Sequence, residues 1–157
     1  MKIKLLQIGT TKTREIDHLI EDYKARLQHF VQFEIISLPD IKNTKTLNES
    51  QQKTKESALF LKQLSTSDWI ILLDEKGKNL TSRGFSKFYQ DKMNSGIKTL
   101  CFLIGGPYGF ADEIYKRAHQ KISLSSMTFT HEMVRLFFIE QTYRAYTILN
   151  HLPYHHD

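Results

Sequence analysis

Two loops of the sequence carry residue types that bind small molecules through the main chain. Residues 105–109, Gly-Gly-Pro-Tyr-Gly, follow the apolar run 99–104, and residues 124–129, Leu-Ser-Ser-Met-Thr-Phe, end the shorter apolar run 121–124. Glycine removes side-chain bulk and permits positive φ, and proline fixes the turn, so bare N–H and C=O groups are left where each run stops. In open α/β sheets, ligands bind at the carboxyl ends of strands. The spacing therefore predicts one pocket, made by both loops, for a nucleoside-bearing cofactor.

The sequence lacks the common motifs for dinucleotide binding, phosphate binding and serine hydrolysis, and its cysteine and histidines form no clear reactive site. The glycine loop is not G-x-G-x-x-G, Gly77-Lys78 lacks the rest of a phosphate-binding P-loop, and no G-x-S-x-G segment exists. Cys101 is the only cysteine, which excludes a disulfide, and its place inside an apolar run predicts a buried thiol. His151, His155 and His156 are close together, but only the terminal Asp157 is a nearby carboxylate. A flexible tail is therefore favoured over a metal site, and we expect no bound metal.

The composition is that of a soluble protein with a modest positive charge. The 157 residues suffice for one domain with a core, 40% of them are hydrophobic and 25% charged, and the net charge is +5. A basic balance suits an anionic partner such as RNA, although many basic proteins bind none. The first residues are too interrupted for a signal peptide, and no apolar run approaches the ~20 residues of a membrane span. We therefore expect a cytoplasmic protein with no membrane partner.

Apolar runs and helical periodicities alternate along the chain. Strands are expected at 3–8, 33–38, 69–73, 99–104 and 121–124, and helices at about 13–30, 48–64, 82–93, 112–118 and 130–149. The run 69–73 is apolar throughout, as in strands covered on both faces, and a polar turn is expected at 74–78. The first turns of the helix at 48–64 carry almost no apolar residue and are expected to be exposed or mobile. The alternation predicts a single-domain α/β fold with one mostly parallel sheet and helices on both faces.

The last predicted helix has almost no polar face in its first half. The apolar residues there are Met133, Val134, Leu136, Phe137, Phe138 and Ile139. A helix that is apolar all round must be buried all round, and a terminal helix of a three-layer domain is normally covered on one side only. We therefore predict a homodimer through this helix, with two-fold symmetry. The alternative is that helices of the same chain cover it.

Several motifs together resemble those of one enzyme family. They are the glycine loop, the Leu-Ser-x-Met-Thr-Phe loop, His131-x-x-x-Arg135, Glu140-Gln141-x-Tyr143-Arg144-Ala145 and the terminal Pro153-Tyr154-His155. In order and spacing, over essentially the whole chain, they look like the RlmH family. These are the large-subunit ribosomal RNA pseudouridine N3-methyltransferases H, a group of SPOUT methyltransferases.

The resemblance implies a fold, a partner and a reaction. It implies one SPOUT methyltransferase domain over residues 1–157, with a C-terminal trefoil knot at about 99–149 and a tail at 150–157. It also implies a homodimer, S-adenosylmethionine as methyl donor, and methylation of N3 of a pseudouridine in a 23S rRNA stem-loop on the assembled 70S ribosome. Two other interpretations stay open. One is a SPOUT enzyme acting on another RNA such as tRNA, and the other is a non-catalytic RNA-binding or ribosome-associated protein.

The resemblance also assigns the cofactor-binding positions. They are Leu73, Gly105, Leu124, Ser125, Ser126, Met127, Thr128 and Phe129. Adenine requires apolar walls and backbone hydrogen bonds, which these residues can share, and carbonyl oxygens suit the positive charge of a sulfonium. Leu124 and Phe129 can instead be core residues, and Gly105 can be a tight turn without a ligand.

The chemistry of the side chains makes His131, Arg135, Tyr154 and His155 the candidate catalytic residues. Imidazoles titrate near neutral pH, so His131 and His155 are candidates to remove the N3 proton. Arg135 and Arg144 can hold phosphates or developing negative charge, and Tyr154 can stack on an unpaired base. His131 can instead be an ordinary first-turn residue, and Arg144 an ion-pair partner of Glu140.

The C-terminal tail carries one departure from the family and one expectation about assembly. His156 stands where the family often has Arg or Lys, which makes a tail–phosphate contact pH-dependent. Because the tail follows the predicted dimer helix, it can complete the active site of the second subunit.

Overall fold

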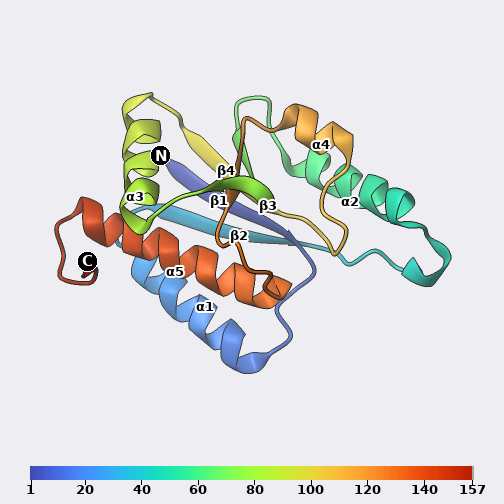
Figure 1. The fold of residues 1–157 in the computed structure, drawn as a ribbon, viewed down its shortest axis with the longest axis horizontal. Helices are drawn as coiled ribbons and strands as arrows, with labels where there is room; N and C mark the ends of the chain where they lie inside the picture. The colour runs from blue at the N-terminus through green and yellow to red at the C-terminus, as the bar shows by residue number, and fades with distance from the viewer. Residues whose placement is uncertain (157) are drawn as a thin grey trace.

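Strands and helices alternate in the computed structural model, which describes residues 1–156 (Figure 1). The strands are β1 (Lys2–Ile8), β2 (Gln32–Leu38), β3 (Trp69–Asn79), β4 (Thr99–Ile104) and β5 (Gln120–Ser123). The helices are α1 (Arg14–Leu27), α2 (Glu49–Gln63), α3 (Ser82–Asn94), α4 (Asp112–Arg117) and α5 (His131–Leu149), and a short 3-10 helix, η1 (Thr44–Thr46), precedes α2. Asp157, the last residue of the predicted domain and tail, lies outside the described residues.

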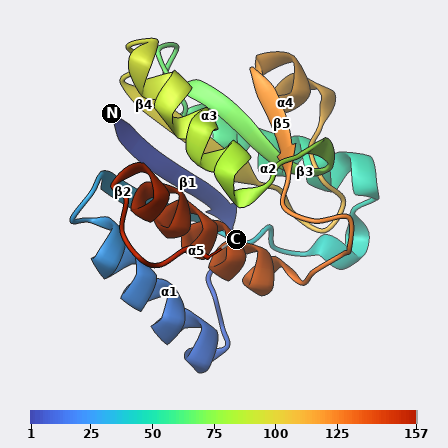
Figure 2. The same cartoon turned by 60° about the vertical axis from the view of Figure 1, so that its left-hand side comes forward.

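All five strands pair in parallel, in the order β2-β1-β4-β3-β5. Side chains alternate between the two faces of a strand, and the central strand β4 shows this. Leu100, Phe102 and Ile104 belong to one hydrophobic core, and Cys101 and Leu103 to the other. Helices α1, α3 and α5 cover the first of these faces and α2 and α4 the second (Figures 1 and 2). The predicted α/β fold, a parallel sheet with helices on both faces, is confirmed.

Helix α5 packs against both α1 and α3, so part of its apolar surface is covered by the same chain (Figure 2). The helix begins after Thr130, whose hydroxyl accepts a hydrogen bond from the Met133 N–H at 3.4 Å. Phe138 is fully buried, and its ring centroid lies 4.7 Å from that of Phe102 on β4. Leu136 and Phe137, by contrast, are only partly buried. The single chain therefore leaves one side of the first half of α5 incompletely covered.

The segment after Leu73 is strand, and the turn predicted at 74–78 is wrong. Strand β3 continues to Asn79 and pairs with β5 a second time after a register shift, so that Leu73 and Lys78 both lie opposite Ile122. Gly77 permits this close approach, because a Cβ there would lie 2.5 Å from the carbonyl carbon of Ile122. The added length brings polar residues to the edge of the sheet where β4 and β5 end.

Helix α2 begins with a capping box, and its polar first turns are not all exposed. The Gln51 N–H donates to Asn48 Oδ1 at 2.8 Å, and the Asn48 N–H donates to Gln51 Oε1 at 3.0 Å. Gln52 and Glu56 are nevertheless buried, at 8% and 2% relative exposure. The expectation of exposure is therefore wrong for these two residues, whose side chains face the glycine loop side of the sheet.

The pairing of the strands does not describe how the chain passes through its own loops, so the trefoil knot at about 99–149 stays a prediction. No helix among residues 1–156 has both the length and the hydrophobicity needed to cross a lipid bilayer.

Candidate functional site

A pocket of about 450 Å³ lies at the carboxyl ends of three neighbouring strands. Strand β3 runs between β4 and β5, and Leu73 is opposite Ile104 on one side and Ile122 on the other. The loops that follow β4 and β5 therefore meet beside Leu73. The lining residues are Leu73, Asp74, Glu75, Lys76, Ile104, Gly105, Gly106, Pro107, Tyr108, Gly109, Phe110, Tyr115, Ser123, Leu124, Ser125, Ser126, Met127, Thr128, Phe129, His131 and Val134.

All eight residues predicted to bind the cofactor line this one pocket, and so does His131. Two of them, Leu124 and Phe129, also pack against other apolar residues, as the alternative interpretation of these two as core residues requires. Leu124 is partly buried against the core of the α5 face, and the ring of Phe129 lies 4.8 Å from that of Phe137, edge to face. Met127 has no such packing role, because it is 71% exposed. The two loops thus form a common wall, with apolar side chains held in place from behind.

The glycine loop is a tight turn whose main chain faces the pocket. The Gly109 N–H donates to the Gly106 carbonyl oxygen at 3.0 Å, and Gly109 has φ of +76°, which favours glycine. A Cβ at Gly105 would lie 3.1 Å from the Gly109 oxygen and 3.3 Å from Cε1 of Phe110. A side chain is therefore excluded at position 105, and residues 105–109 line the pocket as a compact turn.

The second loop is held by serine and asparagine side chains. The Ser123 hydroxyl donates to the Ser125 carbonyl oxygen at 2.8 Å, and the Met127 N–H donates to the Ser125 hydroxyl at 2.9 Å. Asn79, on the added part of β3, donates to the Ser126 hydroxyl at 2.9 Å. The extension of β3 therefore supports the loop that closes the pocket.

Acidic and aromatic residues that the sequence analysis did not select also line the pocket. The Tyr115 hydroxyl, on α4, donates to Asp74 Oδ2 at 2.6 Å, and the Lys76 N–H donates to Asp74 Oδ1 at 2.8 Å. Burial and the bond to Asp74 raise the pKa of Tyr115 to about 12, so the phenol stays a hydrogen-bond donor. The sequence feature that could have identified Asp74 is its position, because residues 74–76 directly follow an apolar run at the edge of the sheet where ligands bind.

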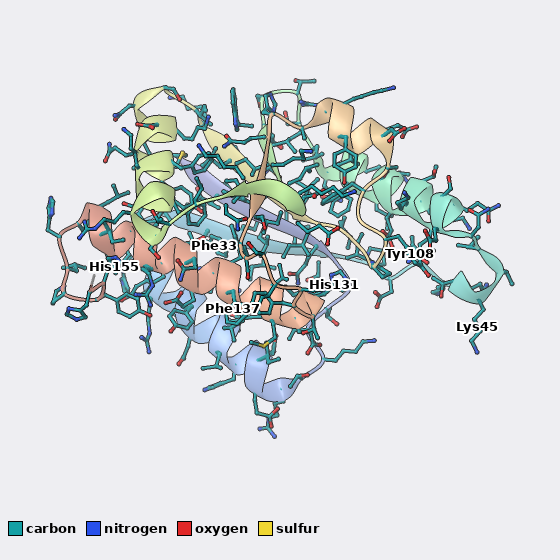
Figure 3. All side chains as sticks on the ribbon, in the orientation of Figure 1. Phe33, Lys45, Tyr108, His131, Phe137 and His155 are labelled. Atoms are coloured by element: carbon teal, nitrogen blue, oxygen red, sulfur yellow. The ribbon has the colours of Figure 1, made fainter. Side chains whose placement is uncertain are left out.

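His131 is the first residue of α5 and stands at the rim of the pocket (Figure 3). His131 is exposed overall, but partial desolvation of its imidazole and the nearby positive charge of Arg135 lower its pKa below the ordinary 6.5. The imidazole is therefore neutral at pH 7 and can accept a proton from a group bound in the pocket.

Arg135 does not line the pocket, because it is buried behind it. Its Nη2 donates to the Ile8 carbonyl oxygen at 2.6 Å, and Nη1 donates to the Thr11 hydroxyl at 3.2 Å. Nearby, Glu132 Oε1 accepts the Lys12 N–H at 2.6 Å. These contacts fasten the start of α5 to the loop after β1, and at 5% exposure the guanidinium cannot meet an RNA phosphate. A positioning role therefore fits Arg135 better than the predicted catalytic role.

His155 lies at the other end of α5 from His131, as Figure 3 shows, and Tyr154 packs against Glu140 and Tyr143 near the middle of the helix. The helix has 19 residues, which spans about 28 Å at 1.5 Å per residue. The Tyr154 hydroxyl donates to Glu140 Oε1 at 3.0 Å, and the same oxygen accepts two bonds from Arg144 at 3.1 and 2.5 Å. Arg144 is thus the ion-pair partner of Glu140, and the tail folds onto its own chain away from the pocket.

Metal chemistry has no candidate centre in the part of the chain that the structure describes. There, no three His, Cys, Asp or Glu side chains gather closely enough to hold a metal ion.

Comparison with known proteins gives the family. The model of the family described as "Predicted SPOUT methyltransferase" matches residues 1–155. The protein of Flavobacterium johnsoniae called ribosomal RNA large subunit methyltransferase H is 58% identical over 157 residues, all of both chains. The protein of the same name from Christiangramia forsetii is 56% identical over 156 residues, 99% of each chain.

A more distant likeness is to a Legionella pneumophila structure with the bound cofactor SAM. It has a TM-score of 0.46 and 12% identity, covers 90% of this chain and 65% of that one, and supports no conclusion about this protein. The full-length family match and the close relatives confirm the resemblance noted from the motifs, and the chain belongs to the SPOUT methyltransferases, in the group of the large-subunit ribosomal RNA methyltransferases H.

Proposed function

We propose that this protein is an S-adenosylmethionine-dependent methyltransferase that methylates N3 of a pseudouridine in a stem-loop of 23S rRNA, on the assembled 70S ribosome in the cytoplasm. The observation that carries the proposal is the shared pocket. The loops at 105–109 and 124–129, which follow β4 and β5 and were predicted to expose main-chain polar groups, line the same cavity beside Leu73. The names of the close relatives support ribosomal RNA of the large subunit as the substrate.

The lining of the pocket suits a nucleoside joined to a positive charge. Apolar side chains such as Leu73, Leu124 and Phe129 provide walls for adenine, and the glycine loop provides backbone donors and acceptors without obstruction. Asp74, Glu75 and Lys76 also line the cavity, and the two acidic residues outweigh the single lysine, which favours a cation there. When bound, S-adenosylmethionine supplies an electrophilic methyl group carried on a sulfonium.

The chain itself has to position the base and take up its proton. In the reaction a bond forms between N3 and the methyl carbon, the carbon–sulfur bond breaks, and the N3 proton leaves. His131 is the proposed acceptor of that proton, because its imidazole is at the pocket rim and is neutral at pH 7. Exposed Tyr108, also on the lining, is placed to contact the incoming RNA. Most of the rate is expected from holding the two reactants in line.

The proposed homodimer would bring the tail to the pocket. His155 lies at the far end of α5 from His131, and Tyr154 is bonded to Glu140 near the middle of that helix, so neither lines the pocket of its own chain. The apolar side of α5 at Met133, Leu136 and Phe137 is only partly buried in the single chain, which supports pairing with a second copy there. In such a dimer the tail of the second copy would supply Tyr154 and His155 to this pocket. Sedimentation equilibrium tests the assembly, and a monomer at micromolar concentration would contradict it.

Methyl transfer from isotopically labelled S-adenosylmethionine tests the function. Purified 70S ribosomes, free 23S rRNA and tRNA are compared side by side, with the RNA taken from a strain that lacks the gene. We expect incorporation into 23S rRNA within 70S ribosomes, at a pseudouridine identified by mass spectrometry. Incorporation into tRNA alone would show a SPOUT enzyme with another substrate. Absence of any calorimetric binding at millimolar S-adenosylmethionine would favour a non-catalytic RNA-binding protein.

A further inference from the structure

Strand β3 is interrupted directly after Leu73, at the edge of the sheet where the pocket lies. Leu73 is the last residue of β3 that pairs with β4, and both Leu73 and Lys78 lie opposite Ile122 of β5. In the described part of the sheet, residues 74–77 therefore have no partner of their own in either ladder. Extra residues of this kind form a β-bulge, which re-aims side chains and is frequent beside functional sites. Here the bulge supplies residues 74–76 to the lining of the pocket.

Asp74, the first residue of this bulge, has a hydrogen-bond donor at each oxygen of its carboxylate. The Tyr115 hydroxyl donates to Oδ2 at 2.6 Å, and the Lys76 N–H donates to Oδ1 at 2.8 Å. The second bond, from the backbone two residues on, is a common way for an aspartate to stabilise a turn. An ionised carboxylate has about four lone-pair positions, so two bonds leave it able to accept more. Because Asp74 is only partly buried and lines the pocket, acceptor positions remain for a ligand there.

Tyr115 reaches Asp74 from helix α4. Its ring packs edge to face on Phe110, with the two ring centroids 6.0 Å apart, and Lys121 Nζ lies 5.6 Å from its ring centroid. A Cβ added at Gly109 would lie 3.9 Å from the Tyr115 oxygen, so the hydroxyl lies beside the glycine loop. The ring is thus held by contacts that do not need the hydroxyl, and the hydroxyl is left to orient Asp74.

The pair lies where the apolar wall of the pocket ends. Leu73, which precedes Asp74, belongs to the core of the α5 face and lines the pocket. Glu75 and Lys76, which follow it, are exposed. S-adenosylmethionine joins an adenine, which suits the apolar wall, to donor groups on its ribose and on its methionyl ammonium. A carboxylate that is already fixed in orientation binds such a donor at a smaller entropic cost than a mobile one.

We propose that Asp74 is a cofactor-binding residue and that Tyr115 is the positioning residue that orients it. Asp74 accepts a hydrogen bond from an N–H or O–H donor of S-adenosylmethionine, and Tyr115 acts on the cofactor only through Asp74. The inference rests on the proposed function and adds two residues to its site. If the pair were only a structural tie between α4 and β3, its removal would lower stability without a specific effect on the cofactor.

Substitutions at the two positions separate the two roles. Asp74→Asn removes the charge at nearly the same shape, Asp74→Ala removes both acceptor oxygens, and Tyr115→Phe removes the hydroxyl while keeping the ring. Asp112→Asn is the control, because Asp112 is an exposed acid on the same helix as Tyr115 and does not line the pocket. For each variant, and for Tyr115→Phe combined with Asp74→Ala, calorimetry measures the Kd for S-adenosylmethionine and thermal unfolding measures stability. Initial rates give KM for the cofactor and for the ribosomal substrate.

We expect Asp74→Asn to weaken cofactor binding about tenfold, as the loss of one charge-assisted hydrogen bond does, and Tyr115→Phe to weaken it about threefold. Asp112→Asn should bind like the wild type. In the Asp74→Ala background, Tyr115→Phe should weaken binding no further, because its hydroxyl then has no carboxylate to orient. The KM for the cofactor should rise in Asp74→Asn and Tyr115→Phe while the KM for ribosomes stays the same. A rise in both KM values together with a lower thermal midpoint would indicate a structural tie and overturn the inference.

Related ligands identify the donor group. S-adenosylhomocysteine lacks the positive charge on sulfur, and 5′-methylthioadenosine lacks the methionyl ammonium as well. Asp74→Asn should weaken the binding of S-adenosylmethionine and S-adenosylhomocysteine equally. Weaker binding of 5′-methylthioadenosine too would assign the donor to the nucleoside, and unchanged binding would assign it to the ammonium. If only S-adenosylmethionine bound less tightly, Asp74 would attract the sulfonium rather than accept a hydrogen bond, and the inference would be wrong.

Two further results overturn the inference. One is Asp74→Asn binding S-adenosylmethionine as tightly as the wild type, and the other is Tyr115→Phe changing the Kd by the same factor with and without Asp74→Ala. The proposed function can fail separately. If the wild-type protein binds no S-adenosylmethionine, the function fails and the inference with it. If the wild type binds and methylates while Asp74→Asn is unaffected, only the inference fails.

Discussion

Replacing Gly106 by alanine tests whether the space behind the glycine loop is as tightly filled as the structure indicates. Gly106 does not have a positive φ, so alanine can adopt the same backbone conformation, and the cost is steric. The new methyl group collides with both oxygens of Glu56, which must move and lose the bond from Gln52. The overpacking and the displacement of the buried carboxylate destabilise the folded state, whereas alanine stabilises the protein slightly by reducing the conformational entropy of the unfolded chain. The expected net loss in unfolding free energy is about 2 kcal/mol.

A double-mutant cycle with Glu56→Ala isolates that collision. In the Glu56→Ala background the methyl group at position 106 has room, so the substitution should cost little, and the coupling energy should be about 2 kcal/mol. Urea unfolding of the four proteins measures both values. Calorimetry with S-adenosylmethionine on the same proteins should show weaker binding for Gly106→Ala alone than for the wild type. The same loss of stability from Gly106→Ala in both backgrounds would refute the reasoning, because the methyl group would then be colliding with something other than Glu56.

Three further changes address the rest of the framework. Gly77→Ala should cost about 2 kcal/mol in urea unfolding, because its Cβ would lie 2.5 to 2.8 Å from the Ile122 main chain, which is paired with β3. Unchanged stability would contradict the register shift. Arg135→Met should lower stability by about 2 kcal/mol, since the Ile8 carbonyl loses a charged donor, with only a small change in methylation rate per folded molecule. A large loss of rate at unchanged stability would instead make Arg135 catalytic. Burial raises the pKa of Glu56 above 4.5, so the folded state holds that proton more tightly and stability falls as pH rises through this range. The stability of Glu56→Gln relative to the wild type should therefore be greater at about pH 8 than at about pH 4.5, and an equal difference at both would contradict the shift.

The pocket was predictable from local chemistry. A run such as Leu100 to Ile104 alternates between two cores, so it reads as a buried strand, and Gly-Gly-Pro after it must be a turn with exposed main chain. The carboxyl ends of parallel strands lie at one edge of the sheet, so the loops after Ile104 and Ser123 were expected on the same side. The strand order, which puts Leu73 of β3 between the two loops, comes from the structure.

The supporting residues were not predictable, because their roles come from contacts distant in sequence. Gly77 reads as a turn residue until Ile122 is placed against it, and Glu56 reads as solvent-exposed on a polar helix until Gly106 is packed on it. Arg135 shows the opposite error. Its motif suggests phosphate binding, but the guanidinium donates to the carbonyl of Ile8, at the end of β1, and to the hydroxyl of Thr11 in the loop that follows. The position of a charged residue on a helix does not by itself determine whether its side chain faces the core or the solvent.

The central claim is that the loops after β4 and β5 together hold S-adenosylmethionine. Amide chemical shifts of the isotopically labelled protein, followed by NMR during titration with S-adenosylmethionine, test it residue by residue. The prediction is that the largest shifts fall in two separate stretches, at Gly105, Gly106 and Gly109 and at Leu124 to Phe129, and that both saturate with the same Kd. Shifts confined to one of the two stretches, or centred on the C-terminal tail, would contradict a shared pocket.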